Sequence, residues 1–125
     1  MKAGKIIHQF MAAYNERDLE KFVSFMDPQF ESYLFDSRDI LCSGIGDARK
    51  IYEKRFSENK NLFVTTLQRI INDNVVVESQ FIEGFDSDKT IHAIAIFELN
   101  GDKVKRASFV RREVKPDGNA IQLVV

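Results

Sequence analysis

The sequence predicts one α+β domain in which helices come first and strands follow. Apolar residues recur at intervals of three and four over residues 3–26 and 47–56, which is the spacing of amphipathic helices. From residue 61 the period changes to two, in segments rich in Val, Ile, Phe and Thr that are separated by short polar turns. Helices followed by an unbroken series of strands are typical of an α+β fold.

The first two helices are predicted from their apolar faces and from one cap. Residues 2–15 form a helix whose buried stripe comprises Ala3, Ile7, Phe10, Met11 and Tyr14. Asp18 is placed to cap a second helix, because its side chain can accept from the free amides of the first turn. The buried side of that helix comprises Leu19, Phe22, Phe25 and Met26. Asp27 and Pro28 are expected to end it, since a proline disfavours helical geometry at the residue before it.

Strands are predicted at residues 30–35 and 40–43, and a third helix follows the turn at Gly44 and Gly46. This helix has Asp47 near its start and an apolar side comprising Ile51, Tyr52 and Phe56. Four longer strands cover residues 62–71, 75–85, 90–99 and 104–114, and a last one covers 120–125. The turns between the four long strands are short, so these strands form an antiparallel meander with one face available to the helices.

Composition excludes several classes of protein. The 125 residues fit a single domain spanning 1–125, and 18 basic against 19 acidic residues give a net charge of −1. No run of like charge suggests a nucleic-acid or membrane partner, and no signal sequence or spanning segment is visible, so a cytoplasmic location is expected. Cys42 is the single cysteine and is expected to be buried. No spacing of His, Cys or carboxylates indicates a metal site, and no cofactor is expected.

Residues 91–99 predict an assembly surface. Ile91, Ala93, Ala95, Phe97 and Leu99 form one apolar face of this strand. The opposite face carries His92, Ile94 and Ile96, whereas a strand with one face in water alternates more cleanly. We therefore expect a homodimer through the outer face of the sheet.

Three signatures resemble the SnoaL-like domain of the nuclear transport factor two superfamily, which also contains ketosteroid isomerase. They are residues 12–22 (AAYNERDLEKF), the helix entry at 44–52, and the hairpin 93–104 with 109–111. The likeness covers about residues 3–114. It implies a cone-shaped fold in which a strongly curved antiparallel sheet wraps around the long N-terminal helix, with two further helices and a pocket at the wide end.

The same resemblance argues against ketosteroid isomerisation. That reaction uses a carboxylate base with a Tyr and a protonated Asp that stabilise the oxyanion. At these positions the chain has Leu34 in place of the base, Phe10 in place of the Tyr and Ala95 in place of the Asp. All three chemical groups are therefore missing.

Four polar residues remain as candidates for the pocket. Asp36 lies two residues beyond the base position and is either a carboxylate at the pocket mouth or part of a solvated turn. Tyr14 and Tyr52 are either catalytic hydroxyls or core tyrosines with satisfied hydroxyls. By the resemblance, Arg111 shares an inward face with Ala107 and Phe109, and it is either the fixed cation of the pocket or part of a salt bridge at the sheet edge. A register shifted by one residue would turn Arg112 inward instead.

Two functions follow from these candidates. One is a pocket enzyme, an isomerase, cyclase or hydratase acting on an apolar metabolite, with Asp36 and Tyr14 as catalytic groups. The other is a non-catalytic ligand-binding or dimeric assembly module. The expected partner is an apolar small molecule, with or without an anionic group; in the non-catalytic module the pocket either holds an apolar molecule or is closed by side chains. The expected ligand-binding residues are Phe10, Phe25, Leu34, Tyr52, Ala95, Phe109 and Arg111.

Overall fold

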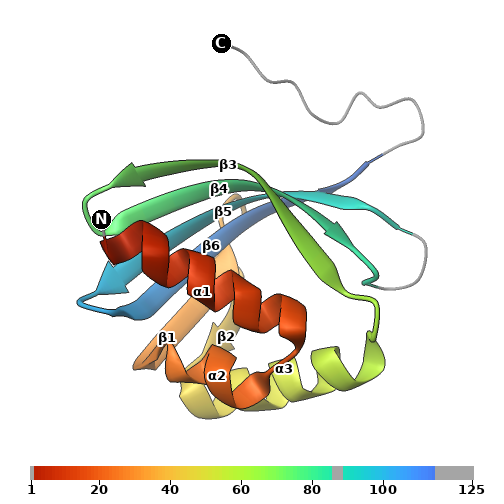
Figure 1. Cartoon of the computed structure of the whole chain (residues 1–125), viewed down its shortest axis with the longest axis horizontal. Helices are drawn as coiled ribbons and strands as arrows, with labels where there is room; N and C mark the ends of the chain where they lie inside the picture. Colours follow the sequence, from red (N-terminus) through yellow and green to blue (C-terminus); the bar gives the residue numbers. More distant parts are fainter. Residues whose placement is uncertain (1, 86–88, 115–125) are drawn as a thin grey trace.

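The computed structural model describes residues 2–85 and 89–114 and shows three helices and six strands within them (Figure 1). The helices are α1 (Lys2–Glu16), α2 (Leu19–Ser24) and α3 (Ile45–Glu58). The strands are β1 (Met26–Leu34), β2 (Ile40–Ser43), β3 (Phe63–Asn72), β4 (Val75–Glu83), β5 (Ile91–Asn100) and β6 (Lys103–Glu113). The α+β class is confirmed, whereas the strand expected at residues 120–125 lies outside the described residues.

The junction of α1 and α2 follows the predicted chemistry. The stripe of α1 is buried, with Ile7 at 0% and Phe10 at 3% exposure. The chain leaves α1 at Arg17, whose φ of 55° lies in the left-handed region and prevents the helix from continuing. Asp18 then caps α2, and its Oδ1 accepts from the Lys21 amide at 3.2 Å.

The end of α2 differs from the prediction. The helix stops at Ser24, so Phe25 is its C-cap and Met26 begins β1 rather than completing a helical stripe. Pro28 lies inside β1, where a proline would normally remove a ladder hydrogen bond. The β1–β6 register passes from Met26 to Glu31 while the partner strand advances only from Val104 to Arg106, so Pro28 lies in a bulge that needs no ladder donor.

The sheet is mixed, with the strand order β2-β1-β6-β5-β4-β3. Strands β3 to β6 form the predicted antiparallel meander. β1 pairs with β6 in parallel, which the sequence analysis did not predict. This pairing joins the N-terminal hairpin β1–β2 to the last strand of the meander.

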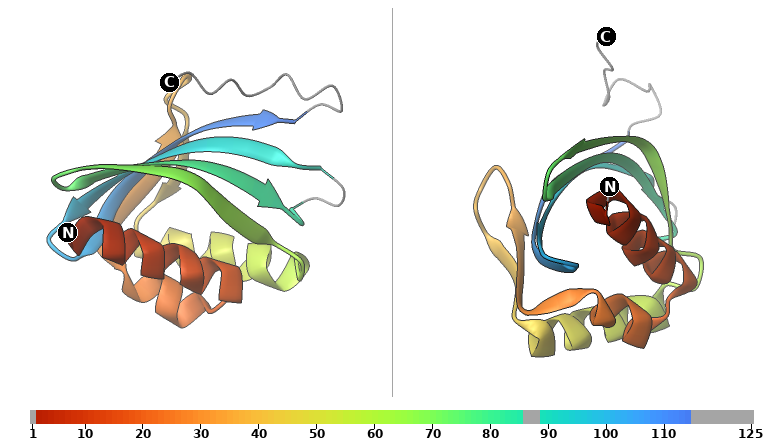
Figure 2. Two further views of the ribbon diagram at one scale, coloured as in Figure 1. Left: turned by 45° about the horizontal axis from the view of Figure 1, so that its top comes forward. Right: turned by 60° about the vertical axis from the view of Figure 1, so that its left-hand side comes forward.

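The sheet curves strongly around α1 without closing, and α2 and α3 lie beside the open side (Figure 2). This is the predicted cone. Its core lies between α1 and the concave face of the sheet and includes Phe30, Phe97 and Leu62, each no more than 2% exposed. Among the described residues, no helix is long and apolar enough to cross a membrane.

Candidate ligand-binding pocket

A pocket lies between the helices and the concave face of the sheet. Its inner volume is about 60 Å³, which is room for roughly four waters. Its empty space reaches about 630 Å³ when the opening to solvent is included. Most of its lining is aromatic or aliphatic, and its polar lining residues are Tyr14, Tyr52, Arg55, Gln80 and Arg111. The pocket is thus a mostly apolar space with a few polar groups, as small-molecule sites usually are.

The register of β5 and β6 turns Arg111 into this pocket. Arg111 pairs with Ala93, and Phe109 pairs with the fully buried Ala95, so both lie on the concave face. The alternative register with Arg112 inward does not occur. Arg112 faces the other side of β6, where its Nη2 is 2.8 Å from Oδ2 of Asp36.

Arg111 is held in an apolar setting without a counter-ion among the described residues. Its guanidinium carbon lies 4.6 Å from the centre of the Phe109 ring. Burial lowers the pKa of Arg111, and the nearby charge of Arg55 acts in the same direction. Among buried side-chain nitrogen and oxygen atoms of the described residues, only Arg111 Nε has no hydrogen-bond partner. An enclosed donor of this kind costs free energy until an acceptor reaches it.

Arg55 is a second pocket cation that the sequence analysis missed. It extends from α3 over the rings of Tyr52 and Phe85, at 4.9 and 5.1 Å from their centres. Burial acts to lower the pKa of Arg55, but the phenols of Tyr52 and Tyr14 outweigh burial and the pKa is raised. A signal for it did exist, because Arg55 is three residues from Tyr52 and lies at the edge of the apolar side of α3.

The two predicted tyrosines meet in the pocket. Tyr14 from α1 and Tyr52 from α3 are 7% and 6% exposed, and their ring centres are 6.2 Å apart. Burial raises the pKa of Tyr52, against the smaller opposing effect of Arg55, so its hydroxyl stays protonated and able to donate. Both hydroxyls belong to the same polar end of the pocket as Arg55.

The other predicted residues divide between the pocket and its surroundings. Phe10 lines the pocket and stacks on Phe22 with ring centres 4.3 Å apart. The residues predicted for the pocket that the structure places outside its lining are Phe25, Leu34, Asp36 and Ala95. Asp36 lies on an exposed turn, where its hydrogen bond with Arg112 lowers the pKa of its carboxyl. The placement of Asp36 corresponds to the solvated-turn alternative.

The lining residues of the described chain include no carboxylate and no histidine. His92 lies on the convex side of β5, where its Nε2 is 2.8 Å from Ser79 Oγ. No group of three or more His, Cys, Asp or Glu residues within 2–85 and 89–114 is arranged to hold a metal ion. The chemistry available in the described lining is therefore positive charge from two arginines and hydrogen bonding by two phenols and one amide.

A shallower depression continues the pocket toward solvent. It has a volume of about 240 Å³ open to water centres, and Phe85, Ile91 and Arg111 are shared with the inner pocket. Its rim adds two further cations, Lys89 and Arg112, and one carboxylate, Glu113. Arg111 thus lies where the inner pocket opens into the outer depression.

A curved mixed sheet around a long first helix, with an apolar pocket between them, defines the nuclear transport factor two-like class of α+β proteins. The sequence profile of the SnoaL-like domain matches residues 7–107, so the chain belongs to the SnoaL-like domain family. No curated protein sequence matches the chain.

Solved structures show the same fold at low sequence identity. A protein from Novosphingobium aromaticivorans described as an uncharacterized cystatin fold protein has a TM-score of 0.81 and 19% identity, covering 89% of this chain and 99% of its own. A SnoaL-like protein from Burkholderia thailandensis has a TM-score of 0.74 and 13% identity, covering 89% and 94%. TerC, co-crystallised with polyporic acid, has a TM-score of 0.75 and 14% identity, covering 90% and 92%.

Proposed function

We propose that this SnoaL-like protein binds a small apolar molecule bearing an anionic group, and that Arg111 holds the anion. The observation that carries the proposal is the buried Nε of Arg111, which has no hydrogen-bond partner among the described residues. A carboxylate would accept from this donor and offset the cost of burying the guanidinium. No acidic side chain of the described lining competes with a ligand for Arg111, because that lining contains two arginines and no carboxylate.

The dimensions of the pocket favour a ligand about the size of one ring. The inner space of about 60 Å³ for water centres is bounded by rigid aromatic side chains, among them Phe10 and Phe22. A larger substituent would extend into the outer depression past Arg111. The anionic group of such a ligand would then lie at the junction of the two spaces, beside the guanidinium. The complex of TerC with polyporic acid is one instance of an acid crystallised with a protein of this fold.

Binding without catalysis is favoured over acid–base isomerisation, cyclisation or hydration. Those reactions need a group that takes a proton near neutral pH, and the only ionisable groups of the described lining are phenols and guanidinium groups. Burial raises the pKa of Tyr52, which makes that phenol a poorer base. Asp36, the carboxylate considered for this role, is committed to Arg112 on an exposed turn.

Calorimetric titration with benzoate and its neutral analogue benzamide tests the proposal. Benzoate should bind the wild-type protein more tightly than benzamide does. The contact with Arg111 is charge-assisted and partly desolvated, so Arg111→Ala should weaken benzoate binding by about ten- to a hundredfold and change benzamide binding little. Arg106→Ala is the matched control, because Arg106 belongs to the same strand, lies outside both spaces and pairs with Glu31 and Glu98. Equal binding of the two compounds, or equal losses in the two variants, would contradict the proposal.

A further inference from the structure

Gln80 lies in the same cross-strand row as Arg111. On the concave face, Gln80 of β4 pairs with Ala93 of β5, and Ala93 pairs with Arg111 of β6. Two strand spacings of about 4.8 Å therefore separate Gln80 from Arg111. Ala93 between them is fully buried and has only a methyl group, and both flanking side chains line the pocket. The row thus presents two polar side chains with a small residue between them.

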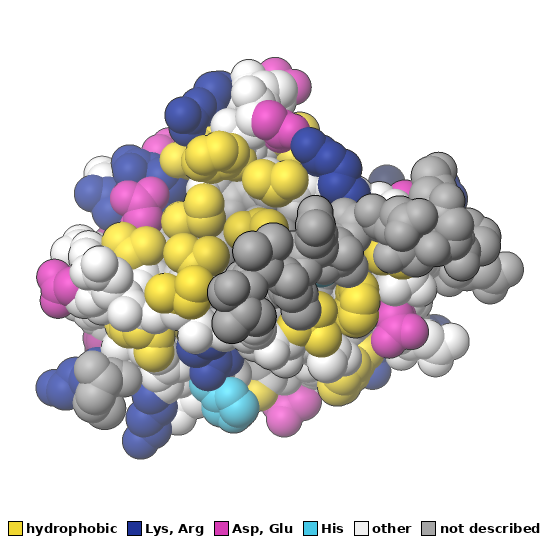
Figure 3. All heavy atoms as spheres, turned by 90° about the horizontal axis from the view of Figure 1, so that it is seen from above, with side chains coloured by type: hydrophobic (Ala, Val, Ile, Leu, Met, Phe, Trp, Pro, Cys, Tyr) yellow, Lys and Arg dark blue, Asp and Glu magenta, His cyan; other side chains and the backbone are white. Residues whose placement is uncertain are grey.

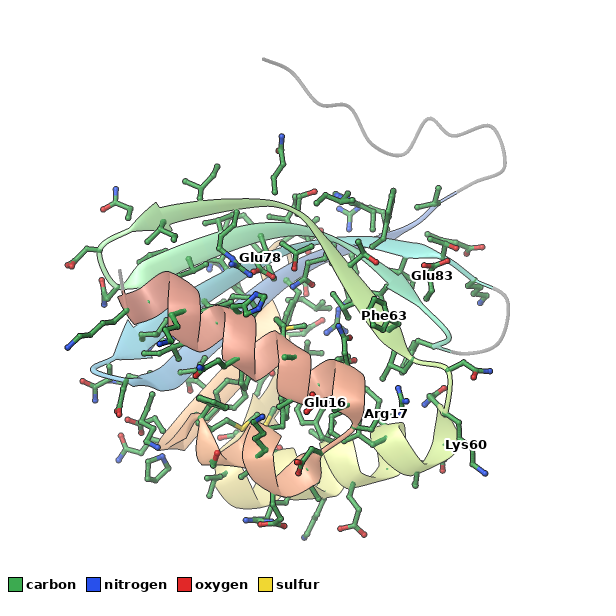
Figure 4. All side chains as sticks on the ribbon, in the orientation of Figure 1. Glu16, Arg17, Lys60, Phe63, Glu78 and Glu83 are labelled. Atoms are coloured by element: carbon green, nitrogen blue, oxygen red, sulfur yellow. The ribbon has the colours of Figure 1, made fainter. Side chains whose placement is uncertain are left out.

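A buried carboxylate holds the Gln80 amide in one orientation. Glu78 is 0% exposed and lies on the side of β4 that faces α1 (Figure 4). It forms a salt bridge with Arg69 at 2.7 Å and accepts from the Thr66 hydroxyl at 3.2 Å. Gln80 Nε2 donates to Glu78 Oε1 at 2.8 Å. An ionised carboxylate can only accept, so the nitrogen of the amide must face Glu78 and the oxygen must face away from it.

The orientation leaves the carbonyl oxygen of Gln80 for a ligand. No residue within the described ranges donates to this oxygen, and Gln80 supplies the only amide or carboxyl side chain among the described lining residues. The other charged or polar groups of the pocket are the hydroxyls of Tyr14 and Tyr52 and the guanidinium groups of Arg55 and Arg111. Arginine cannot accept a hydrogen bond, and the two phenols, which can, interact with Arg55. Gln80 is therefore positioned to recognise a hydrogen-bond donor.

The geometry points to a ligand with two polar ends, an anionic group held by Arg111 and a hydroxyl group that donates to Gln80 Oε1. This inference rests on the proposed anion site and adds the second determinant of specificity. The class of ligand is a small hydroxy acid with an apolar body, such as a ring, lying in the pocket between the side chains of Gln80 and Arg111. Glu78 acts only through Gln80 as a positioning residue. A ligand with a carboxylate and no donor would still bind, but less tightly.

Titrations with 3- and 4-hydroxybenzoate, compared with benzoate and 4-methoxybenzoate, test this inference. At least one hydroxybenzoate should bind the wild-type protein about fivefold more tightly than benzoate, the gain expected for one neutral hydrogen bond. The methoxy compound cannot donate and should show no such gain. In Gln80→Met, which keeps the length of the side chain and removes the carbonyl, the hydroxyl should no longer increase the affinity, whereas benzoate should bind as before.

The two proposals fail in different ways. If benzoate binds and depends on Arg111 but neither hydroxyl isomer gains affinity, the role of Gln80 is excluded while the anion site stands. If benzoate itself does not bind, the proposed function fails first. A hydroxyl gain that persists in Gln80→Met assigns the acceptor to another group and overturns the inference. If Gln80→Met does not fold, Tyr14→Phe and Tyr52→Phe decide the point, because they remove the other hydroxyl acceptors of the described lining: the hydroxyl gain should persist in both, and its loss in either would overturn the inference.

Discussion

Asn15 at the end of α1 and Val64 in β3 are joined by two reciprocal hydrogen bonds. Asn15 Nδ2 donates to the Val64 carbonyl at 3.0 Å, and the Val64 amide donates to Asn15 Oδ1 at 2.8 Å. The side-chain amide thus pairs with the backbone of β3 as a neighbouring strand would. Arg17 Nη1 donates a further hydrogen bond to the Leu62 carbonyl at 2.7 Å. Part of the signature that resembles the SnoaL-like family therefore serves to attach α1 to the sheet.

Replacing Asn15 should destabilise the fold. Asn15→Ala leaves a partly buried amide and carbonyl of Val64 without partners, and we expect the free energy of unfolding to fall by about 1–3 kcal/mol. Urea denaturation followed by circular dichroism measures the change. Asn100→Ala is the control, because Asn100 is exposed and its bond to Asp27 at 3.3 Å is long. A loss for Asn15→Ala no larger than that of the control would show that the attachment contributes little.

The wild-type protein should not isomerise a Δ5-3-ketosteroid. Phe10 lines the pocket with a ring that has no proton to donate, and Leu34 and Ala95 supply neither a base nor an acid. We expect no conversion above the rate in buffer. The absorbance of the conjugated product measures this rate. Robust turnover would mean that another residue supplies the base and that the positions have been assigned incorrectly.

The convex face of the sheet has an apolar row that suits self-association. Ile70, Val77 and Ile96 are cross-strand neighbours there, and Ile70 is 66% exposed. Hydrophobic side chains gather on this side of the molecule beside Lys and Arg (Figure 3). Water contacts this apolar surface in the single chain, and a second copy would remove it from water.

We propose that two chains pair through this face. Light scattering at micromolar concentration should give about twice the chain mass of 14.4 kDa. Ile96→Asp should give monomers or insoluble protein, because it places a charge in a desolvated contact. Lys50→Asp, on the exposed side of α3, should leave the mass unchanged. A wild-type monomer at these concentrations would refute the pairing.

Stability should fall in alkaline solution through Cys42. Burial raises the pKa of the Cys42 thiol from 9.0 to about 11, with a further contribution from Asp47. Between about pH 9 and 11 the folded chain keeps this proton while the unfolded chain releases it, so raising the pH favours unfolding. The raised pKa of Tyr52 acts in the same direction. Urea denaturation from pH 8 to 11 should show a shallower loss for Cys42→Ala than for the wild type, and identical slopes would contradict the assignment.

Local patterns predicted most of the fold. The cap at Asp18, the strand Ile40–Ser43 and the four-strand meander follow from neighbouring residues in the chain. The parallel pairing of β1 with β6 joins residues about 75 positions apart, such as Ser32 and Ala107, and no local period encodes it. The sequence around Pro28 predicts a helix end, because the bulge that accommodates a proline within β1 depends on the pairing with β6.

Only part of the candidate site could be predicted from the sequence, because the rest depends on tertiary packing. The family resemblance predicted Arg111 on the inward face and left the shifted register open, and the β5–β6 pairing has Arg111 on the concave face. The alternation in β4 places Glu78 and Gln80 beside the apolar Val76 and Ile82, which is a signal that polar side chains enter the core. Arg55 is harder to predict, since its place over Tyr52 and Phe85 depends on how α3 packs against the loop after β4.

The side-chain NMR signal of Arg111 Nε–H tests the anion site most directly. In the free protein this group has no hydrogen-bond acceptor among the described residues. Titration with benzoate should shift its proton resonance downfield in a saturable way, while the Arg106 Nε–H signal stays in place because that group lies outside both spaces and donates to Glu31. Loss of the signal in Arg111→Lys would assign it. Saturable benzoate binding that leaves the Arg111 resonance unmoved, or no binding at all, would contradict the account.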